Sequence, residues 1–137
     1  MAVPDLSYCF GCGKDNPKGL YLVNRYEGDR SVMELTVEKE QCGFPGILHG
    51  GIIFTMLDEV MHYAIFKHNL ETVTISVQID FLSPGWVGRR LAAEGWVENI
   101  EGKYVSAASE VKDLSNGKIL ARASGKFKIV ELEKFHS

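Results

Sequence analysis

The sequence predicts an α+β fold in which one long buried helix lies against an antiparallel sheet. Near residues 50–67, apolar side chains recur at helical spacing and cover most of the helix circumference. After it, between residues 73 and 130, four long segments have strand patterns separated by turn signals. A helix that is apolar nearly all round needs a sheet curved about it, so we expect one long central helix wrapped by about five to six strands.

The composition fits one domain over residues 1–137. Of these residues, 45% are hydrophobic and 24% are charged, which argues against global disorder. The formal net charge of −3 provides no general attraction to nucleic acid or to an anionic membrane, so we expect neither as a partner. The N-terminus shows no basic and apolar leader, and the three cysteines are an odd number, so we expect a reducing, cytoplasmic location.

The segments before the helix are expected to be partly irregular. Residues 1–18 should form an irregular arm, because glycine and proline interrupt them repeatedly. Residues 19–26 are expected as a first strand, and residues 31–37 as its hairpin partner across a Gly28-Asp29 turn. A loop rich in glycine and proline, residues 41–49, then leads into the helix.

The segments after the helix are expected to form a meander of four strands. The first, residues 73–81, alternates apolar and polar side chains with a period of two. The next three are expected at residues 91–100, 103–114 and 118–130. The last pair is joined by Asn116-Gly117, the strongest short hairpin signal in the chain.

The start of the helix carries the residues that point to chemistry. Gly50 and Gly51 follow His49 directly and allow another backbone or a ligand to approach closely. The first N–H groups of a helix lack intrahelical partners, so they can hold an anion or a developing oxyanion. Asp58 lies two turns further on, where a carboxylate can act as a base toward water or attack directly. The residues alone leave open purely structural roles, with the glycines as packing devices and Asp58 bonded to backbone.

Four motifs stand together in this chain. They are Cys9-Phe10-Gly11-Cys12-Gly13, Asn16-Pro17-Lys18-Gly19-Leu20, Pro45-Gly46-Ile47-Leu48-His49-Gly50-Gly51 and Met56-Leu57-Asp58-Glu59. Together they resemble the PaaI-like group of hotdog-fold acyl-CoA thioesterases, and the similarity covers nearly the whole chain. The resemblance implies hydrolysis of an acyl-CoA thioester to free acid and CoA, with no resident cofactor and no metal.

The resemblance also implies roles for individual residues. Asp58 matches the helix carboxylate that serves as general base or nucleophile, and Gly51 matches the glycine whose N–H polarises the thioester carbonyl. His49 matches the histidine that helps to position the site, with Gly50 beside it at the substrate. Thr74 lies where some relatives carry a hydroxyl residue that orients water. Sites of this family lie between subunits, so a homodimer or homotetramer is implied.

The chain departs from the family pattern at one position. Some PaaI-like enzymes carry an Asn six residues before the histidine, where this chain has Gly43. Gln41 is the candidate to replace that Asn at the substrate. Arg89 and Arg90 are a further candidate pair, either contacting the CoA phosphates or standing solvated at a strand edge.

Four other side chains in or near these motifs are candidates for further roles. Cys9 and Cys12 have the spacing of a zinc knuckle, but the sequence offers no second cysteine pair, so we expect two small buried thiols and no metal. Glu59 points about 100° away from Asp58 around the helix and is expected to be supporting or solvated. His62 could pair with Asp58, four residues before it.

Two alternative functions remain open from the sequence. Gly43 motivates a non-catalytic acyl-CoA or lipid binding module on the same fold. Phe44-Pro45-Gly46 resembles a loop of hotdog dehydratases, in which a histidine precedes it, and so suggests an enoyl thioester hydratase or dehydratase. Here Gly43 takes that place, so the dehydratase base is missing.

Overall fold

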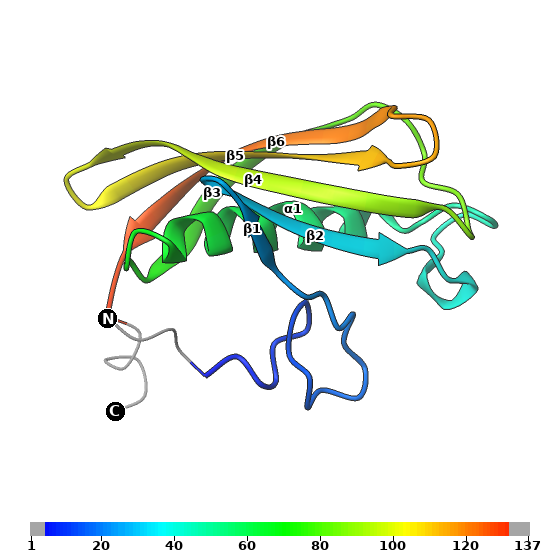
Figure 1. Ribbon diagram of the computed structural model, residues 1–137, viewed down its shortest axis with the longest axis horizontal. Helices are drawn as coiled ribbons and strands as arrows, with labels where there is room; N and C mark the ends of the chain where they lie inside the picture. Colours follow the sequence, from blue (N-terminus) through cyan, green and yellow to red (C-terminus); the bar gives the residue numbers. More distant parts are fainter. Residues whose placement is uncertain (1–4, 132–137) are drawn as a thin grey trace.

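The computed structural model describes residues 5–131 and shows one helix lying against one face of a curved antiparallel sheet (Figure 1). This confirms the expected α+β class and the single central helix. The helix is α1 (Gly50–Phe66), preceded by the short 3-10 helix η1 (Lys39–Gln41). The strands are β1 (Arg25–Glu27), β2 (Arg30–Thr36), β3 (Thr72–Phe81), β4 (Arg90–Glu101), β5 (Tyr104–Asp113) and β6 (Ile119–Ile129).

The six strands pair in the order β1-β2-β4-β5-β6-β3, with every neighbouring pair antiparallel. Helix α1 carries the chain from β2, on one side of the sheet, to β3 at the opposite edge. The predicted meander of four strands is correct only for β4, β5 and β6, because β3 pairs with β6 at the sheet edge and not with β4. The bounds of these three strands differ from the predicted ones by one residue at each end, within the usual uncertainty of element ends.

Strand β3 contains an irregularity that matters for the site. Its pairing with β6 shifts between Thr74 and Ser76, so that Ile75 is an extra residue in the ladder. Such a bulge bends a strand and changes the direction in which the neighbouring side chains point.

The predicted first strand is wrong over most of its length, because only Arg25–Glu27 joins the sheet. The Leu20 N–H donates to Phe10 O, and the Leu22 N–H donates to Gly11 O. Tyr21 adopts a left-handed backbone with φ 55, which strand residues do not. Residues 20–22 therefore bond to the irregular arm rather than to the sheet. The arm itself is confirmed as irregular for residues 5–18, and residues 1–4 lie outside the described part of the chain.

Helix α1 supplies the centre of the core. Seven of its side chains are buried against the sheet: Ile53, Met56, Leu57, Val60, Met61, Ala64 and Ile65. They meet buried side chains from the facing strands, among them Met33 of β2, Leu91 of β4 and Phe127 of β6. Burying a large apolar side chain contributes about 1.5–3 kcal/mol, so this contact dominates the stability of the fold. No helix among residues 5–131 is long and apolar enough to cross a membrane.

The closest approach of helix and sheet occurs at Gly95 in β4. A Cβ atom at Gly95 would lie 2.4 Å from the carbonyl oxygen of Val60 and 2.9 Å from the backbone nitrogen of Met61. Backbone atoms cannot rotate out of the way as a flexible side chain can. Gly95 is therefore the residue that lets α1 lie directly on β4.

We expect Gly95→Ala to destabilise the protein by roughly 1–3 kcal/mol, because the added methyl group forces α1 away from the sheet. Urea unfolding followed by circular dichroism measures the change. Gly50→Ala is the matched control, since a Cβ there meets only Phe81 at 3.6 Å, an ordinary contact. Equal stability of Gly95→Ala and the wild type would contradict the proposed close approach.

Asp113 caps the hairpin between β5 and β6 from a buried position, with a relative exposure of 2%. Its Oδ1 accepts hydrogen bonds from the Ser115 N–H at 2.9 Å and the Ser115 hydroxyl at 2.6 Å. The Arg89 guanidinium lies 3.7 Å away. Burial alone would raise the pKa of Asp113, but the hydrogen bonds from Ser115 and the charge of Arg89 outweigh it and lower the pKa.

A lowered pKa in the folded state means that the Asp113 carboxylate stabilises the protein above the ordinary aspartate pKa of about 3.9. This stabilisation is lost as the pH falls through the lower folded-state value. We expect Asp113→Asn to lower the free energy of unfolding by about 1–2 kcal/mol at neutral pH. Below about pH 4, the difference in this free energy between the variant and the wild type should become smaller. Urea unfolding at several pH values measures this gap, with exposed Asp80→Asn as the control. A gap that stays constant with pH would refute the assignment.

Candidate active site

His49 ends the loop before α1 and caps the helix. Its ring Nδ1 accepts a hydrogen bond from the Gly51 N–H at 2.8 Å, and its carbonyl accepts from the Ile52 and Ile53 N–H groups. The expectation that the N–H groups at the helix start are unpaired is therefore wrong for Gly51 in this conformation. Because Nδ1 is an acceptor, the neutral His49 ring carries its proton on Nε2. His49 controls access to the Gly51 N–H.

A cavity of about 660 Å³ opens beside this helix start. His49 and Gly50 form its polar end, and apolar side chains including Phe44, Phe81 and Leu82 line the rest. These three apolar side chains are 80%, 56% and 53% exposed, which is unusual for residues of this size. The cavity can accept an apolar group whose polar end reaches the helix N-terminus.

Asp58 lies on α1 beside β3, and two polar side chains surround it. The Thr74 hydroxyl donates to Asp58 Oδ1 at 3.0 Å. His62 Nε2 lies 2.9 Å from the same hydroxyl and 3.6 Å from Asp58 Oδ2. Since Thr74 has one proton and donates it to the carboxylate, its oxygen accepts from His62, whose Nε2 carries the proton.

The predicted pairing of His62 with Asp58 is therefore made mainly through Thr74. The His62 ring is held from its other side by Phe127, edge to face at 4.9 Å between centroids. Asp58 Oδ2 is left as the oxygen able to accept a proton, and the Asp58 side chain is 26% exposed. The sequence named all three residues, but the bulge in β3 that turns Thr74 toward the helix left no signal in the apolar and polar alternation.

Gly51 and Asp58 do not face one another within a single chain. Seven residues separate them, which is about 10 Å along a helix axis. One carbonyl group cannot touch both at hydrogen-bonding distance. Asp58 is also absent from the lining of the cavity at the helix start. Gly51 and Asp58 are therefore two separate polar positions on one chain.

Gln41 and Gly43 lie near His49, and the amide oxygen of Gln41 is already bonded within its own loop. The Gln41 Oε1 accepts from the Glu38 N–H at 2.9 Å, and its carbonyl accepts from the His49 N–H. A Cβ at Gly43 would lie 3.3 Å from the His49 ring. Position 43 is thus beside the ring, so an asparagine there would contact His49. In this chain Gln41 holds the loop instead.

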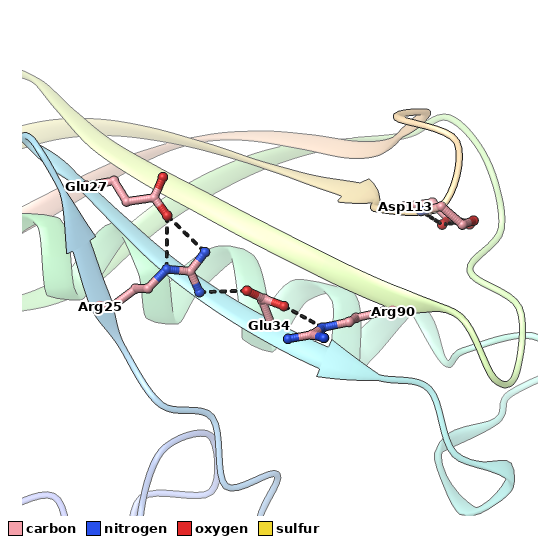
Figure 2. Close-up of polar contacts among 6 residues, drawn as sticks. Arg25, Glu27, Glu34, Arg90 and Asp113 are labelled. Carbon is pink, nitrogen blue, oxygen red and sulfur yellow. Dashed lines mark hydrogen bonds and ion pairs between the residues drawn. The ribbon is translucent and has the colours of Figure 1, made fainter.

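Arg89 and Arg90 are both engaged by carboxylates. Arg90 Nε lies 2.6 Å from Glu34, which Arg25 contacts from its other side at 2.6 Å (Figure 2). The hydrogen bond from Arg25, joined by Arg90, lowers the pKa of Glu34. Arg89 contacts Asp113 and the Ser115 hydroxyl. The Arg90 side chain is nevertheless 67% exposed, so its remaining guanidinium N–H groups can reach a solvent-borne phosphate.

Glu59 is half-buried and is bonded to the arm, which agrees with a supporting role, the first of the two roles expected for it. It accepts a hydrogen bond from Cys9 Sγ at 2.9 Å, and Cys12 lies beside it, receiving a hydrogen bond from the Tyr63 hydroxyl at 3.3 Å. Burial raises the pKa of the Cys12 thiol to about 12; the Tyr63 hydrogen bond opposes this, and the Glu59 charge adds to it. The sequence pattern gave no reason to join Glu59 to the two cysteines.

Comparison with known proteins places these features in a family. The family model described as "Thioesterase superfamily" matches residues 45–120, more than half of the chain and the whole interval from the helix start to β6. A putative esterase of Archaeoglobus fulgidus is 32% identical over 93 residues, which are 68% of this chain and 60% of that protein. The acyl-coenzyme A thioesterase PaaI of Escherichia coli is 32% identical over 85 residues, 62% of this chain and 59% of that protein.

The solved structure of E. coli PaaI is similar with a TM-score of 0.76 at 25% identity, covering 82% of this chain and 81% of that one. This similarity confirms the hotdog arrangement of α1 and the sheet. The matches to the two curated relatives span about 60% of each relative's length. On the family match and the shared fold, this chain belongs to the thioesterase superfamily and is PaaI-like.

Proposed function

We propose that this protein hydrolyses acyl-CoA thioesters to a free acid and CoA, with Asp58 as general base or nucleophile. The observation that carries the proposal is the Asp58 carboxylate, held by the Thr74 hydroxyl at 3.0 Å on the buried helix of a thioesterase-superfamily chain. The name of the PaaI relative supports the substrate class. A neighbour in fold from Streptococcus mutans, 20% identical with a TM-score of 0.73, was solved bound to acetyl-CoA. The three free cysteines support a cytoplasmic location.

The proposed chemistry uses two groups, the Asp58 carboxylate and the Gly51 N–H. Asp58 Oδ2 takes a proton from a water molecule as the water oxygen attacks the carbonyl carbon of the thioester. The carbonyl oxygen becomes an oxyanion, which the N–H of Gly51 stabilises at the positive end of the helix. The intermediate then breaks its carbon–sulfur bond, and the CoA thiolate leaves and takes the proton from Asp58. Direct attack by the Asp58 carboxylate would instead break the carbon–sulfur bond, release the CoA thiolate and form a mixed anhydride, which water then hydrolyses to the free acid and the Asp58 carboxylate.

We further propose that each site combines Asp58 of one subunit with Gly51 and His49 of another. The separation of about 10 Å along one helix between Gly51 and Asp58 supports a site built from two chains. A second chain that covers the exposed apolar residues Phe44, Phe81 and Leu82 would bury surface that a monomer rarely leaves open. Rotation of the His49 ring would then release the Gly51 N–H to the substrate carbonyl, with Gly50 leaving room for it.

The proposal also gives roles to Gln41, Arg89 and Arg90, which lie outside the reacting centre. Gln41 shapes the loop that holds His49, while Arg90, the more exposed of the two arginines, is the better placed for the CoA phosphates. A second candidate function is non-catalytic acyl-CoA binding. The observation that favours it is that two groups expected to meet the substrate are already bonded within the chain: the Gly51 N–H at the helix start donates to His49, and Gln41 Oε1 in η1 accepts from the Glu38 N–H.

We expect Asp58→Asn to reduce thiol release by at least about 100-fold, because the amide cannot accept the proton from water. Release of CoA from short, medium, long and aromatic acyl-CoAs, followed with a chromogenic thiol reagent, measures it. Asp80→Asn changes an exposed aspartate of β3 and serves as the matched control. Full activity in Asp58→Asn would contradict the proposed role of Asp58 in the mechanism. Acyl-CoA binding with no thiol release by the folded wild type would favour the binding module.

A mixture of two inactive variants tests whether the site is shared between subunits. Gly51→Pro removes the N–H in the first helical turn, where proline is tolerated. When Gly51→Pro and Asp58→Asn are unfolded together and refolded, each mixed dimer has one intact site, so about a quarter of the wild-type activity should return. Each variant refolded alone is the control. Failure to recover activity from demonstrably mixed dimers would mean that the site lies within one chain.

A further inference from the structure

Two cysteines of the N-terminal arm and one glutamate of α1 converge at a place that the proposed reaction does not use. The Sγ atoms of Cys9 and Cys12 and a carboxylate oxygen of Glu59 all lie within 4.8 Å of one another. All three residues are half-buried. The cysteines come from a segment about 50 residues away from the glutamate, so the fold, not the local sequence, creates the cluster.

Two glycines shape the arm around this cluster. A Cβ at Gly11 would lie 2.2 Å from Glu59 Oε1, and a Cβ at Gly13 would lie 2.5 Å from the Cys9 backbone nitrogen. The Gly13 N–H donates to Cys9 O at 2.8 Å and closes the turn between the two cysteines. Any other residue at position 11 would push the carboxylate away from the thiols. The arm is therefore built to bring Glu59 against the two cysteines.

We propose that Cys9, Cys12 and Glu59 bind one thiophilic divalent cation of the zinc type. Two sulfur ligands and one carboxylate oxygen suit a tetrahedral zinc ion, with water at the fourth position. In such a site, ligand atoms lie roughly 3.5–3.8 Å apart. The 2.9 Å contact between Cys9 Sγ and Glu59 Oε1 would therefore lengthen, while pairs nearer the 4.8 Å limit would shorten, each by roughly 1 Å. Binding displaces the two thiol protons to solvent, and the ion replaces the hydrogen bond from Cys9 to Glu59.

The Tyr63 hydroxyl supports the proposed site from outside. It donates to Cys12 Sγ at 3.3 Å, and a hydrogen bond of this kind orients a metal ligand. Tyr63 lies one turn after Glu59 on α1, so the same helix face supplies a ligand and its supporting partner. Glu59 points about 100° away from Asp58, which separates the cation from the thioester. The cation would fasten the arm to the helix, and the inference does not depend on the proposed reaction.

Metal content tests the inference directly. The full chain, produced with added zinc and purified without chelators under reducing conditions, should contain about one zinc per chain by plasma mass spectrometry. Loading the stripped protein with Co²⁺ should give the charge-transfer absorption of cobalt–thiolate bonds. Loss of a residue that only hydrogen-bonds to a metal ligand typically lowers the metal affinity by ~10–100-fold. Cys9→Ser, Cys12→Ser and Glu59→Gln each remove a ligand and should lower the affinity for zinc by more than that. Tyr63→Phe should stay within that range.

Cys42→Ser is the matched control, because Cys42 is the third free cysteine and is not part of the cluster. It should keep full metal content, and its melting temperature should fall on chelation as in the wild type. In Cys12→Ser, chelation should leave the melting temperature unchanged, since no bound ion remains to be removed. Reduced, folded wild type that binds neither zinc nor Co²⁺ would overturn the proposal, and so would equal metal loss in Cys42→Ser. Neither outcome bears on thiol release.

Discussion

The direct contact of α1 with β4 at Gly95 is the constraint on which the rest of the structure depends. Because a backbone carbonyl of the helix occupies the space where a side chain of the strand would be, the helix lies close against the sheet at this point only as long as position 95 has no side chain. That position fixes the direction of every residue on α1. Asp58 faces β3, Glu59 faces the arm, and the helix start faces the cavity. Chemistry on three sides of one helix thus depends on a single missing Cβ.

The sequence predicts the parts of this arrangement that depend on local patterns. Helix α1 could be predicted because Leu57, Met61 and Ile65 recur at helical spacing, and the last four strands because their alternation and turns are regular. The first strand could not, because Leu20 and Leu22 look like strand residues but bond to the arm. Only the folded chain shows that the arm offers those carbonyls.

Some features of the candidate site can likewise be predicted from the sequence, and others cannot. His49, Gly51 and Asp58 could be named from a motif, whereas the position of the Gly51 N–H against the His49 ring depends on a side-chain rotamer that no pattern reports. Cys9 and Cys12 were noticed as a pair, and their partner Glu59 was missed because it lies 50 residues away. Contacts between distant segments are what sequence periodicity cannot contain. The separation of Gly51 from Asp58, in contrast, follows from helix geometry alone and can be predicted from the sequence.

The extra residue in β3 has a consequence for how this chain can vary. Side chains along a strand point alternately to the two faces of the sheet. An insertion or deletion of one residue between positions 72 and 76 would therefore turn the side chains on one side of the change to the opposite face. The hydroxyl of Thr74 would then point away from the carboxylate that it holds. The start of β3 therefore has a fixed length, whereas the loop between β4 and β5, remote from the helix start, has no such restriction. The two segments lie at the same end of the sheet, since Val73 and Tyr104 both pair with Lys128, yet only a change of length in β3 would separate the Asp58 carboxylate from the hydroxyl that supports it.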